Sequence, residues 1–271
     1  MPCFGLGTFR STGTQCYDST LAALRAGYRL IDTAALYGNE DQVGAAVGQF
    51  LSEQTAVTRS DLFIVTKIHW DAHGADAGER VDEALARLQL DYIDLFLMHS
   101  PKTKRVVETY KALQVVKASG KIRALGVSNF GVKQLEGLIA TEGVEPPSVN
   151  EIELHPWLHQ TDVTGFCKVN NIVVIAYCPF ARTNQFGKTP LAALAARLQT
   201  TEAALCNYWV LKNGFVTIPK STSAARVLEN ITAAGELKLT AADALELDQV
   251  NLNYVCSLSQ SAQDLPWADV A

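Results

Sequence analysis

The sequence has no apolar run of the ~18 residues that a membrane-spanning helix requires. Its apolar stretches are short, and the one around Tyr92 to Met98, for example, is interrupted by Asp94. Residues 1–10 also lack a basic segment followed by an apolar one, which is the pattern of a secretory signal. We therefore expect a cytoplasmic protein that has no membrane partner.

Cysteines are few and scattered, with no CxxC pair and no spacing typical of metal ligands. The six cysteines are Cys3, Cys16, Cys167, Cys178, Cys206 and Cys256. Free, mostly buried thiols are the simplest interpretation, and they are consistent with a reducing compartment. We expect no bound metal.

Positively charged residues are in the minority, because Lys and Arg number 23 against 28 Asp and Glu, a net charge of −5. Such a chain has no general electrostatic attraction to nucleic acid, so no nucleic-acid partner is expected. A local basic site for a phosphate stays open. With 48% hydrophobic and 19% charged residues, the composition excludes a disordered chain and indicates a sizeable core.

The length of 271 residues suits about two average domains, but a barrel of alternating strands and helices fills ~250 residues as one domain. Eight short, mostly apolar runs predict strands that are buried on both faces, as in a parallel sheet. The expected strands are Phe4–Thr8, Tyr28–Asp32, Leu62–Thr66, Ile93–Met98, Ala124–Val127, Ser148–Glu151, Val173–Tyr177 and Phe215–Ile218.

Amphipathic helical patterns separate these runs. Val106, Tyr110 and Leu113, for example, recur at intervals of four and three, which places them on one helix face. The alternation predicts an α/β protein with a single (β/α)8 TIM barrel domain over residues 1–271. A doubly wound open sheet is the alternative, but no GxGxxG motif follows any expected strand.

Polar residues stand at or just after the end of almost every expected strand. They are Asp32, Lys67, His99, Ser128, Asn129, Glu151, Tyr177, Lys220 and Ser221. Each alone has an ordinary explanation, since Asp32 can cap a turn and His99 can be a hydrogen-bonded loop residue. In a barrel, however, the carboxyl ends of the strands face one common mouth. We therefore expect Asp32, Tyr37, Lys67 and His99 to form one cluster.

Six motifs, in this order along the chain, resemble those of the aldo-keto reductase family. They are GLGTF at Gly5–Phe9, YRLIDTAALYGNE at Tyr28–Glu40, LFLMH at Leu95–His99, GVSNF at Gly126–Phe130, VNEIELHP at Val149–Pro156 and IPKST at Ile218–Thr222. The resemblance extends from Gly5 to about Asn230. Because the motifs are long and mutually spaced, the chain is identified as a member of this family.

The resemblance implies reversible hydride transfer between a nicotinamide cofactor and a carbonyl. It assigns catalysis to Asp32, Tyr37, Lys67 and His99. Hydride transfer leaves an alkoxide that needs a proton, and Tyr37 would supply it. The Lys67 ammonium would lower the Tyr37 pKa from ~10, and Asp32 would pair with Lys67. Neutral His99 would hydrogen-bond the carbonyl oxygen and orient the substrate.

The resemblance also implies a cofactor site, and it assigns the nicotinamide carboxamide to Ser128, Asn129 and Glu151. Tyr177 would stack beneath the nicotinamide ring. Residues implied for the 2′-phosphate and the nearby adenine are Lys220, Ser221, Arg226, Glu229 and Asn230. Two cations and a hydroxyl suit a dianionic phosphate, so NADPH is preferred to NADH.

Three features depart from the family pattern. Glu151 stands where the family usually has glutamine, and an ionised carboxylate accepts a hydrogen bond but cannot donate one. Ser100 replaces an aromatic residue after His99, which predicts a smaller and more polar pocket wall. The first expected strand begins almost at the amino terminus, so we expect the barrel without the family's amino-terminal hairpin.

The leading interpretation is a monomeric, NADPH-dependent reductase of small aldehydes or ketones. The expected pocket walls are His69, Trp70, Trp157, Phe180 and Trp267. For Trp157 and Trp267, packing in the core is an equally good interpretation.

Two other functions stay open. One is a non-catalytic NADPH-binding module of the same fold, although the complete set of four catalytic residues argues against it. The other is a barrel enzyme that acts on a sugar phosphate and uses the basic residues after the last strand to hold its substrate. Against it, Ser128, Asn129 and Tyr177 together suit a flat ring that bears an amide.

Overall fold

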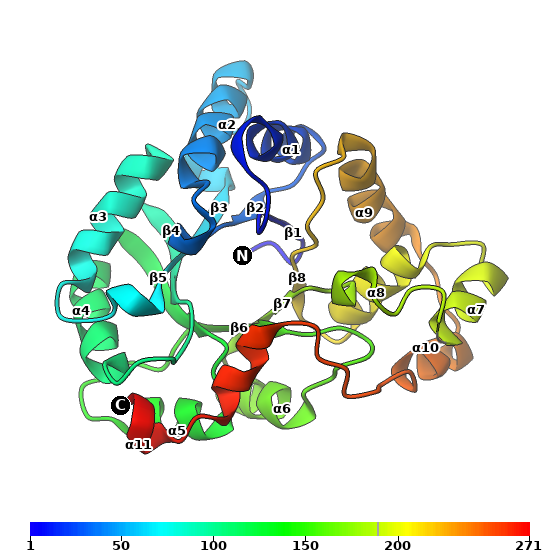
Figure 1. Ribbon diagram of the computed structural model, residues 1–271. Coiled ribbons are helices and arrows are strands. Elements are labelled where there is room, and N and C mark those ends of the chain that lie inside the picture. The colour runs from blue at the N-terminus through cyan, green and yellow to red at the C-terminus, as the bar shows by residue number, and fades with distance from the viewer. Residues whose placement is uncertain (189) are drawn as a thin grey trace.

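The structure is a computed structural model that describes residues 1–188 and 190–271. Eight parallel strands follow one another in chain order around a barrel (Figure 1). They are β1 (Gly5–Gly7), β2 (Leu30–Asp32), β3 (Phe63–Ile68), β4 (Ile93–Met98), β5 (Ile122–Ser128), β6 (Val149–Glu153), β7 (Val173–Tyr177) and β8 (Val216–Thr217). Bridges from Phe4 to Thr217 and from Gly7 to Lys220 bring β8 beside β1. The predicted (β/α)8 fold is confirmed.

Helices surround the strands on the outside of the barrel (Figure 1). The α-helices are α1 (Gly13–Arg25), α2 (Glu40–Glu53), α3 (Ala77–Leu88), α4 (Val106–Ala118), α5 (Val132–Ala140), α6 (Thr161–Val169), α7 (Pro190–Arg197), α8 (Glu202–Lys212), α9 (Ala224–Glu236), α10 (Ala241–Asp248) and α11 (Trp267–Val270). Short 3-10 helices are η1 (Ala35–Tyr37), η2 (Arg59–Asp61), η3 (Trp70–Ala72), η4 (Ala181–Thr183) and η5 (Leu258–Asp264). Among the described residues, no helix is both long and apolar enough to span a bilayer.

Two apolar clusters stabilise the barrel. The inner one, which includes Val65, Leu95 and Leu97, fills the barrel interior, and the larger one lies between strands and helices. Successive side chains of a strand point to opposite faces, so Leu95 and Leu97 face inward while Phe96 and Met98 of the same strand pack outward. Burial of both faces explains why the sequence of β4 is a nearly continuous apolar run.

Some strand ends differ from those predicted. β3 and β6 continue to Ile68 and Glu153, so Lys67 lies inside its strand and Glu151 does not end its own. The expected placement of Lys67 after its strand is therefore wrong. Both side chains point into the barrel, where they pair with each other, and their backbones stay in the sheet, paired with Leu97 and Ile175.

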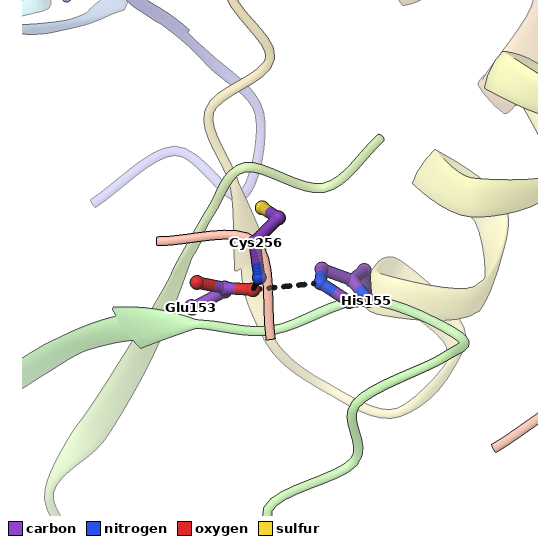
Figure 2. A group of neighbouring side chains, drawn as sticks. All are labelled: Glu153, His155 and Cys256. Carbon is purple, nitrogen blue, oxygen red and sulfur yellow. Dashed lines mark hydrogen bonds and ion pairs between the residues drawn. The ribbon is translucent and has the colours of Figure 1, made fainter. Parts of the chain in front are cut away.

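The carboxyl-terminal segment after α10 returns to the barrel beside β6 (Figure 1). Glu153 holds it there, because its two carboxylate oxygens accept the backbone N–H groups of Cys256 at 2.6 Å and Ser257 at 2.7 Å. His155 Nε2 lies 3.1 Å from Glu153 Oε1 (Figure 2). The potential ligand atoms of Glu153, His155 and Cys256 lie within 4.8 Å of one another. Since the carboxylate already accepts two backbone hydrogen bonds, we interpret the group as a clamp on the carboxyl-terminal segment.

Candidate active site

A cavity of about 540 Å³ opens at the carboxyl ends of the strands. Nine of the residues predicted to form the site line it: Asp32, Tyr37, His99, Ser128, Asn129, Glu151, Tyr177, Phe180 and Lys220. They come from six different strands or the loops that follow them, so the barrel brings together residues that are far apart in the chain.

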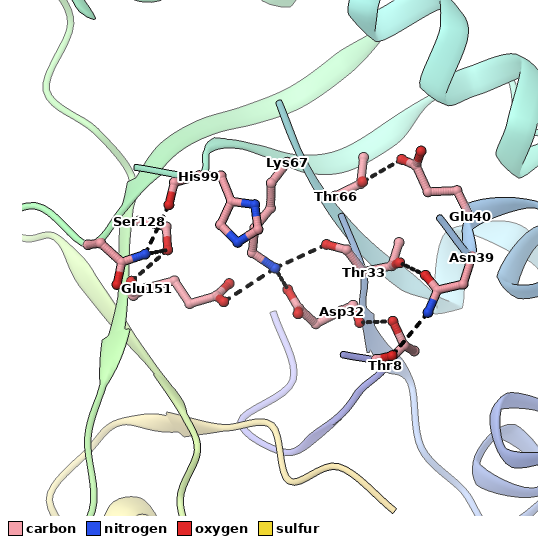
Figure 3. A network of polar contacts seen from close by, with 11 residues as sticks. Thr8, Asp32, Thr33, Asn39, Glu40, Thr66, Lys67, His99, Ser128 and Glu151 are labelled. Atoms are coloured by element: carbon pink, nitrogen blue, oxygen red, sulfur yellow. Dashed lines mark hydrogen bonds and ion pairs between the residues drawn. The ribbon is translucent and has the colours of Figure 1, made fainter. Parts of the chain in front are cut away.

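Lys67 lies at the centre of the polar network (Figure 3). Its Nζ donates to Asp32 Oδ2 at 2.5 Å and to the Thr33 carbonyl at 3.0 Å, and it lies 3.3 Å from Glu151 Oε1. The side chain of Lys67 is fully buried, and both carboxylates are nearly so. Because burial penalises each isolated charge, each of the three depends on the others.

Two carboxyl groups share this one ammonium, and their pKa values shift accordingly. Burial raises the pKa of Glu151 well above its ordinary value, and the charge of Asp32 raises it further. Burial also raises the pKa of Asp32, with Lys67 acting against it. For Lys67, burial lowers the pKa, but the two carboxylates prevail and hold it above its ordinary value. Of the two carboxyl groups, Glu151 is therefore the one that more readily keeps a proton.

Tyr37 lies in η1, next to Lys67 and His99. Lys67 Nζ is 5.4 Å from the centre of the Tyr37 ring, and the His99 imidazole packs edge-on at 5.6 Å. Burial raises the pKa of the Tyr37 hydroxyl, and the Lys67 charge lowers it. Lys67 thus acts in the direction expected from the sequence, but burial has the larger effect.

His99 follows β4 and is buried. Burial lowers its pKa well below the ordinary value, and the positive charge of Lys67 adds to this effect. The imidazole is therefore uncharged at neutral pH. Within the described part of the chain, its Nδ1 atom has no hydrogen-bond partner.

A second hydrogen-bonded group spans β5, β6 and β7. Ser128 Oγ donates to the Glu151 carbonyl at 2.9 Å, and Asn129 Nδ2 donates to the His99 carbonyl at 2.9 Å. The Tyr177 hydroxyl donates to Asn129 Oδ1 at 2.7 Å. These contacts fix the orientation of three residues predicted to bind the cofactor. Oε2 of Glu151 has no hydrogen-bond partner among the described residues, although it is buried.

The basic residues predicted to bind phosphate lie at the exposed rim of this site. Lys220 lines the cavity, and its pKa is lowered by partial burial and by the positive charge of Arg226. Arg226 and Glu229 are exposed on α9, whereas Asn230 is buried there. Ser221 Oγ accepts the Ser223 backbone N–H at 3.2 Å. Arg226, Glu229 and Asn230 do not line the cavity itself.

Four predicted pocket walls lie elsewhere. Trp157 is fully buried, and its carbonyl accepts backbone N–H groups from residues 252 and 254, so it holds the carboxyl-terminal segment. Trp267 lies in α11 and packs on Gly137 of α5. The expectation that either one lines the cavity is wrong, and core packing explains both. The Trp70 ring lies 4.0 Å from the His69 ring and contacts His99 edge-on at 5.9 Å, and neither His69 nor Trp70 lines the cavity.

Ser100 does not form a pocket wall either, because it is buried and does not line the cavity. The aromatic rings that contact His99 edge-on come from other strands, Tyr37 from η1 after β2 and Trp70 from η3 after β3. The expected smaller, more polar wall at Ser100 is therefore wrong.

Several lining residues were not predicted from the sequence. They include Phe9, Arg10, Leu36, Cys178, Arg182 and Leu258. The first five follow β1, β2 or β7, so the rule that barrel sites lie after strand ends could have found them. No motif or charge pattern distinguishes Leu258, which reaches the cavity only because the carboxyl-terminal segment folds back.

Two further buried residues support the site at the start of α2, Asn39 directly before the helix and Glu40 as its first residue (Figure 3). Asn39 accepts from Thr33 Oγ1 at 2.6 Å and donates to the Thr8 carbonyl at 3.0 Å, so it ties the loops after β1 and β2 together. Glu40 accepts from Thr66 Oγ1 at 2.5 Å, beside Lys67. Both lie within a motif on which the resemblance rests, but neither was predicted to have a role.

Comparison with known proteins agrees with the sequence motifs and the fold. The family model described as "Aldo/keto reductase family" matches residues 3–252. This chain belongs to the aldo-keto reductase family. Its members are oxidoreductases that use a nicotinamide cofactor, and the resemblance drawn from the sequence motifs is confirmed.

Individual relatives cover almost the whole aldo-keto reductase chain. Glyoxal reductase of Bacillus subtilis is 36% identical over 253 residues, which span 93% of this chain and 89% of the relative. Glycerol 2-dehydrogenase (NADP(+)) of Saccharomyces cerevisiae is 34% identical over 261 residues, spanning 85% and 82%. The crystal structure of a Bombyx mori aldo-keto reductase in complex with NADP matches with a TM-score of 0.88 at 31% identity, covering 99% of this chain and 95% of that one.

Proposed function

We propose that this aldo-keto reductase reduces aldehydes and ketones to alcohols with NADPH, and that Tyr37 donates the proton. The observation that carries the proposal is the position of Tyr37 in the cavity wall, between the buried Lys67 ammonium and the uncharged His99. Similarity to glyoxal reductase supports an aldehyde as the substrate class.

The residues present fit a nicotinamide dinucleotide. The inner wall offers buried polar atoms without partners in the described residues, Glu151 Oε2 and His99 Nδ1, and the rim offers cations. Ser128, Asn129, Glu151 and Tyr177 would hold the nicotinamide end of the cofactor. When bound, NADPH supplies the hydride to the carbonyl carbon.

The residues of the chain would handle the proton and the developing negative charge. His99, as an uncharged imidazole, would donate a hydrogen bond to the carbonyl oxygen and orient the substrate. Tyr37 would transfer its hydroxyl proton to the same oxygen, and Lys67 would stabilise the resulting phenolate. Asp32, hydrogen-bonded to Lys67 at 2.5 Å, would keep the ammonium in position.

Glu151 would act as a protonated carboxylic acid rather than as a carboxylate. A protonated carboxyl can donate one hydrogen bond and accept another, as the usual glutamine amide does. Its raised pKa and its unpartnered Oε2 support this role. When Glu151 ionises, it would lose the donor and bring a negative charge to the nicotinamide end of the site.

Lys220 and Arg226 would bind the 2′-phosphate, with Ser221 beside them. Partial burial lowers the pKa of Lys220, and repulsion from the positive charge of Arg226 lowers it further. A dianion placed between them would relieve this repulsion and form charge-assisted hydrogen bonds. This arrangement supports NADPH over NADH.

The proposal is tested by NADPH oxidation with 4-nitrobenzaldehyde or glyoxal as the substrate, using wild type and Tyr37→Phe. Loss of a positioned general acid costs about 10²–10⁴-fold in rate, so the variant should lose nearly all activity while binding NADPH almost as the wild type does. Tyr17→Phe, on the outer helix α1, is the matched control and should keep full activity. A Tyr37→Phe enzyme within about threefold of wild type contradicts a role for Tyr37 as the proton donor.

A further inference from the structure

Two of the six cysteines lie together at the cavity, although they are far apart in the chain. Cys178 directly follows β7 and lines the cavity, and Cys256 belongs to the carboxyl-terminal segment. The two thiols interact with each other, because contact with Cys256 lowers the pKa of Cys178 and contact with Cys178 raises the pKa of Cys256. Both are partly buried, and neither is disulfide-bonded.

The fold explains why these two cysteines meet. Glu153 of β6 is paired with Tyr177 of β7, the residue before Cys178. The same Glu153 accepts the backbone N–H of Cys256 at 2.6 Å. Figure 2 shows this backbone nitrogen directed at Glu153, and the Cys256 sulfur lies within 4.8 Å of the potential ligand atoms of Glu153 and His155. The clamp therefore places the Cys256 thiol beside the end of β7.

The surroundings of Cys178 favour its reactive thiolate form. Contact with Cys256 lowers the pKa of Cys178, against the effects of burial and of the Glu153 charge, and Arg182 lowers it further. By contrast, burial raises the pKa of Cys16 and of Cys167 to about 11. The thiolate, not the thiol, is the nucleophile that reacts with oxidants. Cys178, with its lowered pKa, is therefore more reactive than the thiols of the core.

We propose that Cys178 and Cys256 are a peroxide-reactive pair that closes to a reversible disulfide and ties the carboxyl-terminal segment to the end of β7. The Cys178 thiolate attacks one oxygen of hydrogen peroxide, the O–O bond breaks, and a sulfenic acid and hydroxide form. The Cys256 sulfur, after losing its proton, attacks the sulfenic sulfur; the S–O bond breaks and water leaves. The two sulfurs lose two electrons in total, which reduce one peroxide to two water molecules. A dithiol such as dithiothreitol reverses the change.

The cross-link would restrain the segment that closes one side of the cavity. Ser257, Leu258 and Ser259, directly after Cys256, line the cavity together with Cys178. In the reduced protein this segment is held by the hydrogen bonds to Glu153 and to the Trp157 carbonyl. With a disulfide bond in place, the segment would stay attached to the end of β7 even when these hydrogen bonds open transiently.

The experiment treats the reduced full chain with an equimolar amount of hydrogen peroxide and maps the cysteines by mass spectrometry after alkylation. The wild type should lose two of its six alkylatable thiols and yield a Cys178–Cys256 linked peptide that dithiothreitol removes. Cys256→Ser should instead trap a dimedone-reactive sulfenic acid at Cys178, and Cys178→Ser should form no linked peptide. Cys3→Ser, which removes an exposed thiol away from the pair, is the control and should oxidise as the wild type does.

Two results overturn the proposal. One is a wild type in which both Cys178 and Cys256 stay alkylatable while Cys3 is oxidised. The other is a linked peptide without any slowing of amide hydrogen exchange at Cys256 and Ser257, because the cross-link then fails to restrain the segment. These readouts use no cofactor and no carbonyl substrate, so they are independent of the proposed reductase activity.

Discussion

The inner wall and the rim of the cavity both carry positive charge, but in opposite surroundings. Lys67 on the inner wall is fully buried and lies between two carboxyl groups of the chain. Lys220 and Arg226 at the rim are exposed, and among the described residues neither forms an ion pair. The inner charge is thus neutralised by the protein itself, whereas the rim leaves its charge for a ligand. We therefore propose that the inner wall carries out the chemistry and that the rim binds an anion.

The largest effect on the folded state is expected for Lys67→Met. Removing one partner of a buried ion pair leaves an uncompensated charge and typically costs about 3–5 kcal/mol. The loss should be smaller near pH 5 than at pH 8, because Asp32 and Glu151 take up protons when the ammonium is gone. Chemical denaturation at both pH values measures this.

The matched control for Lys67→Met is Arg25→Met, which removes the exposed ion pair to Glu53 at 2.6 Å. An exposed pair is screened by water and contributes little, so this variant should unfold at nearly the wild-type denaturant concentration. Equal losses for the two variants contradict the claim that burial makes the inner cluster different.

A smaller effect, on binding alone, is expected at the rim. Lys220→Ala should weaken NADPH binding by about 1.5–3 kcal/mol if one charge-assisted hydrogen bond is lost, while NADH binding should hardly change. Fluorescence titration of both cofactors measures the two Kd values. Lys238→Ala, another exposed lysine, is the control and should bind both cofactors as the wild type does. Similar losses for NADPH and NADH would place Lys220 away from the 2′-phosphate.

The next effect concerns Glu151, which lies on the inner wall but is proposed to contact the cofactor. Glu151→Gln keeps a hydrogen-bond donor at every pH and removes any negative charge near the nicotinamide. At a pH where Glu151 of the wild type is ionised, we expect the variant to bind NADPH more tightly, with a smaller gain or a loss for NADP⁺; where Glu151 is protonated, the two proteins should bind nearly alike. The same ratio of the two Kd values in wild type and variant at every pH would mean that Glu151 does not sense the ring charge. Glu142→Gln, on an exposed loop, serves as the control.

The smallest effect is a pH dependence of stability. The folded state raises the pKa of Glu151 above its ordinary 4.5, so above about pH 4.5 the folded chain holds a proton that the unfolded chain releases. The contribution of this proton to the free energy of unfolding is present at low pH and is lost as pH rises toward the pKa of Glu151 in the folded state. As pH increases from 5 to 8, the Tm of Glu151→Gln should therefore rise relative to the wild-type Tm, by a few degrees at most. A difference in Tm that is constant with pH contradicts the raised pKa.

The sequence predicted the barrel well because its signals are local. The apolar runs of β4 and β7 have the same bounds in the structure as in the prediction, since both faces of these strands are buried. The cluster of Asp32, Tyr37, Lys67 and His99 followed from the barrel rule and the family resemblance together.

Contacts between distant strands could not be predicted in the same way. The ion pair between Lys67 and Glu151 depends on the direction in which each side chain enters the barrel interior, and so does the exclusion of Trp157 from the cavity. The meeting of Cys178 and Cys256 depends on how the carboxyl-terminal segment folds back onto Glu153. No local pattern in the sequence contains this information.

The division between chemistry at the inner wall and binding at the rim is tested most directly by measuring kcat and the NADPH Kd for both Tyr37→Phe and Lys220→Ala in the same buffer. Tyr37→Phe should lose about 10²–10⁴-fold in kcat with little change in Kd. Lys220→Ala should show the opposite pattern, with Kd raised about tenfold or more and kcat at saturating NADPH changed far less. If both variants lose kcat and affinity in similar proportion, the two parts of the cavity do not have separate roles, and the account is wrong.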